Sequence, residues 1–205
     1  MRPLRRALAL ALVAGGVLTS AAAAGSVTLT PEQEQRLAAG EIVVLDIRPP
    51  GSDPTTGGGT ALAIVNAPVE AVWAVLTDYP GHPRYYPNLV SADVLETSGQ
   101  RVLLRYTVRI GVLSFSFHMN KVPDPVARRI EWQLAQDRSN GLLRENSGYW
   151  LVEARPGGSL VTYAIAVRSY VPGFLTAGSE QRSLVDTITG LRRVVAGQRG
   201  RAADR

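Results

Sequence analysis

Residues 65–79 read VNAPVEAVWAVLTDY, and they mark a change from strand to helix. The apolar, β-branched run 60–65 before them predicts a strand. The Asn-Ala-Pro triplet at 66–68 breaks that strand, and proline suits the first turn of a helix. From Val69 to Leu76, apolar side chains recur at i, i+3, i+4 and i+7, which predicts a helix with one buried face. Residues 78–89 contain three prolines and predict a turn and a short second helical segment.

Downstream of this opening, the period of the apolar side chains switches to two. Such alternation is typical of strands that bury one face and expose the other, as in an antiparallel sheet. The predicted strands are 90–96, 102–110, 113–120, 129–134, 149–153 and 160–168.

The C-terminal part returns to helical spacing over residues 173–195, where Leu184, Ile188, Leu191 and Val195 share one face. A helix of about 20 residues is roughly 30 Å long, enough to cross a sheet. The order of elements therefore predicts an α+β fold, in which a curved antiparallel sheet wraps around a long C-terminal helix and leaves space between them.

Residues 1–24 have the three parts of a secretory signal peptide: arginines at the start, an apolar run over 7–18, and an Ala-Ala-Ala cleavage site at 22–24. They predict Sec export and a secreted or periplasmic protein, and the alternative is an uncleaved anchor helix. Residues 25–59 predict an N-terminal extension, with a short helix begun by a capping box at Thr30 and Gln33, a strand over 41–47, and a flexible loop over 49–59. The main domain spans 60–196, and 197–205 is expected to be a disordered tail.

Composition excludes several kinds of chemistry. The chain has no cysteine, so disulfides, thiol catalysis and zinc–cysteine sites are excluded. Two separated histidines, His82 and His118, do not predict a metal site, and no cofactor is expected. The net charge of +5 falls to +2 without the three arginines of the signal peptide, and the remaining arginines form no basic face. Nucleic-acid binding is therefore not expected.

With these elements in place, the sequence resembles the START-like (SRPBCC, helix-grip) superfamily, and within it the polyketide cyclase/coenzyme Q-binding branch. The residues that carry the resemblance are 65–73 (VNAPVEAVW), 76–79 (LTDY), 86–90 (YPNLV), 148–151 (GYWL) and the helix end 191–193 (LRR). The resemblance covers about residues 60–196. It implies the helix-grip fold, but it does not fix a function, because this superfamily includes both lipid carriers and cyclases.

The resemblance also implies a cavity lined by inward strand residues and by the inner face of the last helix. The ligand-binding residues predicted in this way, from the strands, the last helix and the turn after residue 78, are Tyr79, Tyr86, Tyr106, Val108, Phe115, Phe117, Trp132, Trp150, Tyr163, Leu184 and Ile188. A dry, filled core has the same sequence signature. Residues 79–89 and 171–178 are expected to gate the cavity.

The function favoured by the sequence is therefore binding or transport of a hydrophobic small molecule or lipid, with transient membrane contact as a possibility for a carrier. We expect no catalytic residues: His118 alternates to the solvent side, and His82 lies in a Pro-Gly-His-Pro loop with a role in a turn or at the cavity mouth. The alternatives are a cyclase- or dehydratase-like enzyme, which requires a polar group inside the cavity, and a ligand-free interaction module, which requires a filled core. Arginines at 105, 109, 128, 129 and 144 belong to a solvated outer face or hold an acidic head group at the mouth. The oligomeric state is left open.

Overall fold

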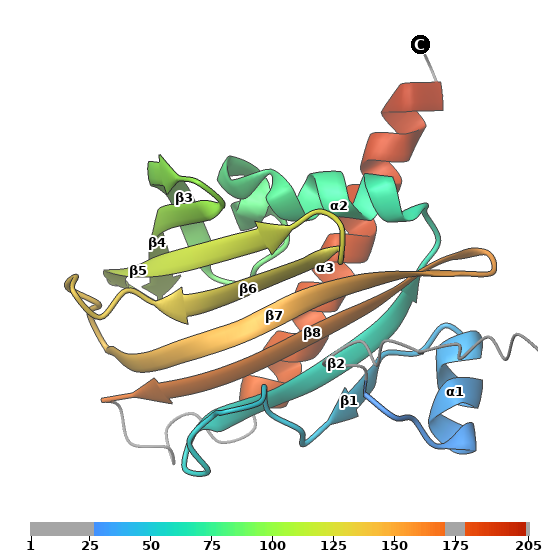
Figure 1. Cartoon of the computed structure of the whole chain (residues 1–205), viewed down its shortest axis with the longest axis horizontal. Helices are drawn as coiled ribbons and strands as arrows, with labels where there is room; N and C mark the ends of the chain where they lie inside the picture. The colour runs from blue at the N-terminus through green and yellow to red at the C-terminus, as the bar shows by residue number, and fades with distance from the viewer. Residues whose placement is uncertain (1–26, 171–178, 204–205) are drawn as a thin grey trace, which may run out of the picture.

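The computed structural model describes residues 27–170 and 179–203, which form one antiparallel sheet covered on one face by helices (Figure 1). The eight strands of this described part lie in the order β1-β2-β8-β7-β6-β5-β4-β3. Their bounds are β1 Val43–Leu45, β2 Gly57–Val65, β3 Leu89–Ser98, β4 Arg101–Ile110, β5 Leu113–Asp124, β6 Arg129–Leu134, β7 Leu143–Arg155 and β8 Gly158–Ser169. All neighbouring strands pair antiparallel.

The helices that follow β2 gather on one face of this sheet, which we call the inner face. The helix α2 (Val69–Thr77) and the 3-10 helix η1 (Tyr79–Arg84) follow β2, and the long helix α3 (Ser179–Ala203) crosses behind the strands in Figure 1. α3 packs against β2, α2 and η1. This arrangement confirms the predicted α+β fold with a long C-terminal helix against the sheet. In the described residues, no helix is long and apolar enough to cross a membrane.

Strand alternation sorts the side chains as expected. In β6, Ile130, Trp132 and Leu134 are buried, whereas Glu131 and Gln133 between them are exposed. The same alternation in the neighbouring strands produces one large core cluster between the inner face and the helices α2 and α3. The core therefore lies in the place where the sequence predicts a cavity.

Several element boundaries differ from the predictions. β2 begins at Gly57, so Gly57 and Gly58 are strand residues rather than part of a flexible loop. β5 continues to Asp124, four residues beyond the predicted end. α3 continues to Ala203, so the expectation of a disordered tail is wrong for residues 197–203. The predicted signal peptide and the second gate segment, 171–178, lie outside the described residues.

The N-terminal extension packs on the other face of the sheet, which we call the outer face. The helix α1 (Pro31–Ala38) begins with the predicted capping box, because the Thr30 hydroxyl accepts from the amide of Gln33 and the Gln33 side chain accepts from the amide of Thr30. Leu37 joins Leu62 and Leu160 in a second buried cluster, which is separate from the core. The extension thus covers apolar side chains of β2 and β8 that point away from α3.

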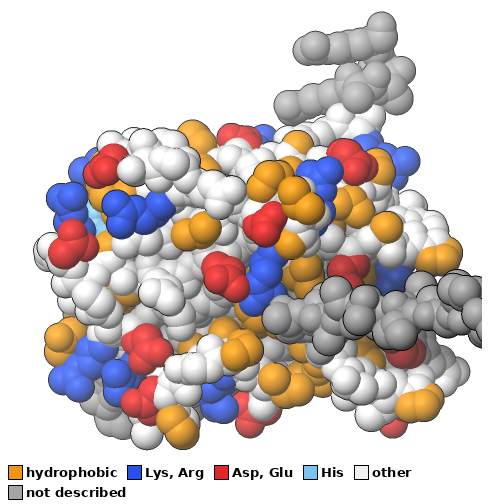
Figure 2. Space-filling view, viewed as in Figure 1, with side chains coloured by type: hydrophobic (Ala, Val, Ile, Leu, Met, Phe, Trp, Pro, Cys, Tyr) orange, Lys and Arg blue, Asp and Glu red, His pale blue; other side chains and the backbone are white. Residues whose placement is uncertain are grey.

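The surface mixes charges of both signs. On the face in Figure 2, Arg side chains are interspersed with Asp and Glu. Arg105 pairs with Asp93 at 3.1 Å, and Arg129 pairs with Glu131 at 2.8 Å. Arg128 lies 3.5 Å from Glu70. These pairs show that three of the five arginines considered above belong to the charged surface rather than to the core.

Candidate functional site

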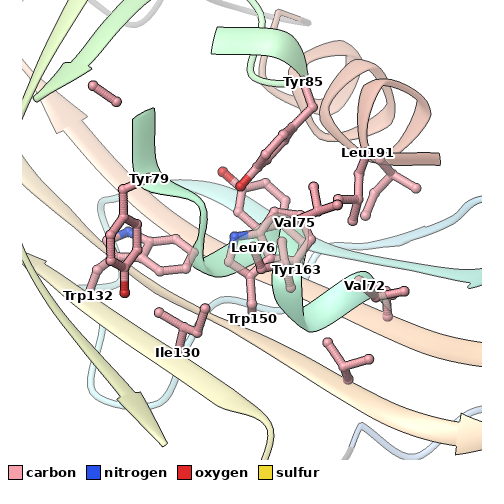
Figure 3. Close-up of a cluster of buried hydrophobic side chains, with 14 of the residues drawn as sticks. Val72, Val75, Leu76, Tyr79, Tyr85, Ile130, Trp132, Trp150, Tyr163 and Leu191 are labelled. Carbon is pink, nitrogen blue, oxygen red and sulfur yellow. The ribbon is translucent and has the colours of Figure 1, made fainter. Parts of the chain in front are cut away.

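Aromatic side chains from five strands and from the segment around η1 meet at the centre of the core (Figure 3). The ring of Tyr163 stacks on that of Trp150, with centroids 4.2 Å apart, and on that of Trp132, with centroids 5.8 Å apart. The Trp150 indole donates a hydrogen bond of 2.8 Å to the Tyr86 hydroxyl. The η1 segment is thereby joined to the middle of the sheet.

Lys121 projects from β5 into this cluster. Its side chain is 1% exposed, and its Nζ lies 5.0 Å from the ring centroid of Trp132 and 5.6 to 5.9 Å from those of Tyr106, Tyr86 and Tyr79. Such rings attract an ammonium group by their quadrupoles. Within the described residues, no carboxylate lies within 4 Å of this nitrogen. Burial lowers the pKa of Lys121 to about 7, so the amine is partly neutral near neutral pH.

The position of Lys121 follows from the pleat of β5. Phe117 and Met119 point to the inner face, and Lys121 is the next residue of the same parity. Lys121 is also the single lysine of a chain whose 22 Lys and Arg are otherwise all arginine. Arginine stays charged at every relevant pH, whereas lysine changes its pKa readily when buried. The basic residue at this core position is thus the type that can lose its charge when it is buried.

His82 in η1 is the second buried polar group of the cluster, with 0% exposure. Its Nε2 lies 3.0 Å from the carbonyl oxygen of Leu76, and its Nδ1 lies 2.6 Å from the Tyr106 hydroxyl. A carbonyl only accepts, so Nε2 carries the proton and Nδ1 accepts from Tyr106. Burial, reinforced by the positive charge of Lys121, lowers the pKa of His82 well below its usual value. His82 is therefore a neutral imidazole.

Tyr79 adds a hydroxyl without a partner. This oxygen is buried, and no hydrogen-bond partner for it occurs in the part of the chain that the structure describes. Burial raises the pKa of Tyr79 to about 12, so the phenol keeps its proton. The Tyr79 ring borders Lys121, so the cluster holds a phenol donor as well as an amine.

The structure brings the predicted ligand residues together. Seven side chains of that set are buried in the core, five from the strands and two from α3: Tyr106, Phe117, Trp132, Trp150, Tyr163, Leu184 and Ile188. Tyr79 is 8% exposed, and Tyr86, Val108 and Phe115 are partly buried at the edge of the same cluster. Their contact with a ligand stays a prediction.

Two hollows of the described surface open away from this cluster, although Trp132 also lines the first of them. A groove of about 510 Å³ runs along the outer face, between the loop at Pro49–Gly51 and outward side chains of β6 and β7, including Glu131 and Tyr149. A second hollow of about 460 Å³ lies at the start of α2 beside Arg199. The aromatic cluster is packed ring against ring, so a ligand reaches Lys121 only when these side chains move apart.

Sequence reasoning missed Lys121 and misplaced His82. The predicted strand ended before Lys121, although extending its alternation by one residue places the lysine on the inner face. The expectation that His82 serves a turn or the mouth is wrong, because the side chain turns inward to Leu76 and Tyr106. His118 points away from the core as predicted and lies 2.8 Å from the Ser139 carbonyl oxygen. Asp78, which precedes η1, makes no side-chain capping bond and pairs with Arg84.

Comparisons with known proteins agree with this architecture. The model of the family described as "Polyketide cyclase / dehydrase and lipid transport" matches residues 65–184. A STAR-related lipid transfer protein from Xanthomonas axonopodis is similar at 13% identity and a TM-score of 0.60, covering 76% of this chain and 92% of that one. The Zhui aromatase/cyclase from Streptomyces sp. R1128 is similar at 16% identity and a TM-score of 0.58, covering 67% and 92%. A START superfamily protein from Mycobacterium smegmatis has 18% identity and a TM-score of 0.57, covering 68% and 97%.

At these identities, the structural likeness shows the fold alone. A comparison with curated protein sequences found no match.

Proposed function

The chain belongs to the polyketide cyclase/dehydrase and lipid transport family, and from this premise we propose that it binds a hydrophobic small molecule or lipid between the inner face of its sheet and α3. One observation carries the proposal: Lys121 is buried at the centre of an aromatic cluster, and no described residue supplies a counter-ion. Methionine would fill this position without the cost of burying an amine. A buried polar group that destabilises the fold is expected at a site that binds a ligand.

Binding would be driven by removal of apolar surface from water, worth about 25 cal/mol for each Å². The route of entry passes the partly buried rim formed by Tyr86, Val108 and Phe115. η1 borders that rim and carries Tyr79 and His82, so an outward movement of η1 would open the cluster.

Export is part of the proposal, because residues 1–24 have the features of a signal peptide. The test of the function uses the chain purified from the periplasm of its host without detergent. Organic extraction followed by mass spectrometry should release a lipid or quinone-like molecule in a ratio near one per chain. An empty extract from repeated preparations would contradict the proposal.

A carrier must also meet a membrane, and the tip of the β4–β5 hairpin is suited to this. Ile110 is 58% exposed, Val112 99% and Leu113 69%. Residues 109–116 and 138–144 contain three arginines and no carboxylate. Gly141 lies against Phe115, which places the two segments side by side. An apolar tip beside positive charge fits the surface of an anionic bilayer.

Vesicle binding tests the membrane contact. The chain should sediment with vesicles of phosphatidylglycerol and phosphatidylcholine, and V112S/L113S should sediment much less. The matched control is V126S, because Val126 is 94% exposed but belongs to the turn between β5 and β6. Equal sedimentation of both variants would argue against the hairpin as the contact.

An enzymatic role is the second candidate, and Lys121 favours it as well. An amine with a pKa of about 7 is suited to take and return a proton near neutral pH. The test incubates the extracted ligand with fresh protein and follows its mass. A change of mass that K121M abolishes would establish an enzyme, whereas an unchanged ligand would favour a carrier.

A further inference from the structure

The cluster around Lys121 is rich in hydrogen-bond donors and poor in acceptors. The amine lies 5.9 Å from the ring centroid of Tyr79, whose buried hydroxyl has no partner in the described residues. The Tyr85 hydroxyl is also buried without a partner in the described residues. His82 is paired with Leu76 and Tyr106, and the Trp150 indole is paired with Tyr86. What the site lacks is an oxygen that accepts from an amine and a phenol together.

The lack of negative charge around Lys121 also indicates that the site would accept an anionic oxygen. The titratable groups that face it are His82 and Tyr79 from η1, Tyr86 after η1, and Tyr106 from β4, and all of these are neutral near pH 7. No carboxylate of the described residues pairs with it. A protonated Lys121 would therefore be an isolated positive charge in an apolar core, which only an incoming anion would neutralise.

We propose that Lys121 binds the carboxylate of an amphiphilic acid, whose apolar part lies between the sheet and α3. This inference rests on the proposed function and names its ligand class. The ammonium donates to one carboxylate oxygen, and the Tyr79 hydroxyl donates to the same group. The rings of Trp132, Tyr86 and Tyr106 surround the ammonium and exclude water from the pair. Without the acid, burial favours the neutral amine, so Lys121 is only partly protonated near neutral pH.

Because Lys121 is the single lysine, its protonation can be followed directly. Growth on lysine labelled with ¹³C at Cε gives one side-chain NMR signal, whose shift with pH reports the pKa of the amine. Addition of dodecanoic acid should raise that pKa by about one to three pH units, the effect of a nearby opposite charge. Addition of 1-dodecanol, which has the same chain without the acid, should leave it unchanged. A pKa unaffected by bound dodecanoic acid would overturn the inference.

The affinities of the same two probes provide the second measurement. K121M should bind dodecanoic acid about 10- to 100-fold more weakly than the wild type, as expected for one lost charge-assisted bond, and should bind 1-dodecanol equally well. Equal binding of the acid by both proteins would refute the role of Lys121 and leave the hydrophobic-ligand function standing. Failure of the wild type to bind either probe would count against both proposals.

Discussion

Lys121 lies at a position where the alternation of β5 calls for an apolar side chain, and this has a cost that can be measured. Burial lowers its pKa from 10.5 to about 7. Between these values the unfolded chain holds a proton that the folded chain has released, so the free energy of unfolding rises with pH across this window. We expect a rise of about 3 kcal/mol between pH 7 and pH 10.

K121M isolates this contribution. The variant should be more stable than the wild type at pH 7 by about 3 kcal/mol, and the difference should shrink towards pH 10. Urea denaturation followed by tryptophan fluorescence at several pH values measures it. The series stops at pH 10, because burial raises the pKa of Tyr79 and of other core tyrosines, so that higher pH favours the unfolded chain. A constant difference between the two proteins would rule out a lowered pKa.

Replacing Tyr106 or Tyr79 by phenylalanine removes the same hydroxyl group, but the expected effects on stability differ. In Y106F, Nδ1 of the buried His82 loses its donor, which should cost about 1 to 3 kcal/mol of stability. In Y79F, the deleted hydroxyl has no partner in the described structure, so the fold should be unchanged or slightly more stable. Thermal melting of the two variants in parallel is the measurement. Equal losses of stability in the two variants would show that the His82–Tyr106 hydrogen bond contributes no more than the unpartnered hydroxyl of Tyr79.

The residues of the site differ in how well the sequence predicts them. Tyr106, Phe117 and Trp132 follow from alternation, because a strand with one wet face must bury the other. Lys121 obeys the same alternation, but a charged side chain in the sequence predicts that the buried part of the strand ends before it. The inward turn of His82 depends on a carbonyl of α2 and on Tyr106 of β4, which are distant contacts that no local pattern encodes.

At the scale of elements, α3 is held against η1 through Gly190. A Cβ at this position would lie 2.6 Å from the carbonyl oxygen of Tyr85 and 2.9 Å from its Cα. G190A should therefore push α3 away from η1 and destabilise the fold by about 1 to 3 kcal/mol. The matched control is G197A in the same helix, where a Cβ meets nothing within 4 Å.

That control should increase stability by up to about 1 kcal/mol, because alanine favours a helix more than glycine does. Chemical denaturation of G190A and G197A measures the free energy of unfolding of each variant. If G190A were as stable as G197A, the close approach of α3 to η1 would not hold in solution.

Glycine also explains why the start of β2 was predicted incorrectly. Local composition makes the glycines of residues 57–59 look like a loop. In the structure, a Cβ on Gly58 would lie 2.1 Å from the carbonyl oxygen of Ile165 in β8. Gly58, with φ of +120°, is thus required by the pairing of β2 with β8. Only the neighbouring strand, which is about a hundred residues away, shows this.

At the scale of the whole molecule, the sheet is buried on both faces near β2. α3 covers the inner face, and α1 covers the outer face through Leu37, which packs with Leu62 and Leu160. The outer cover is made of residues that lie outside the family match, which begins at residue 65. The extension therefore supplies part of the structure that the matched segment lacks.

Removal of residues 27–56 tests that role. The shortened chain would expose Leu62 and Leu160, which are 2% and 3% exposed in the structure, and it would leave β2 as an unprotected edge. Two leucines returned to water correspond to a loss of about 3 to 6 kcal/mol, a large share of the roughly 5 to 15 kcal/mol that stabilises a typical domain. The point variant L37A should lose about 2 to 4 kcal/mol, whereas Q35A on the exposed side of α1 should lose almost nothing. Thermal melting and binding of an apolar dye compare the four chains. A shortened chain that has the melting temperature of the wild type and binds no dye would show that the extension does not stabilise the rest of the fold. In that case L37A and Q35A would also have the same melting temperature.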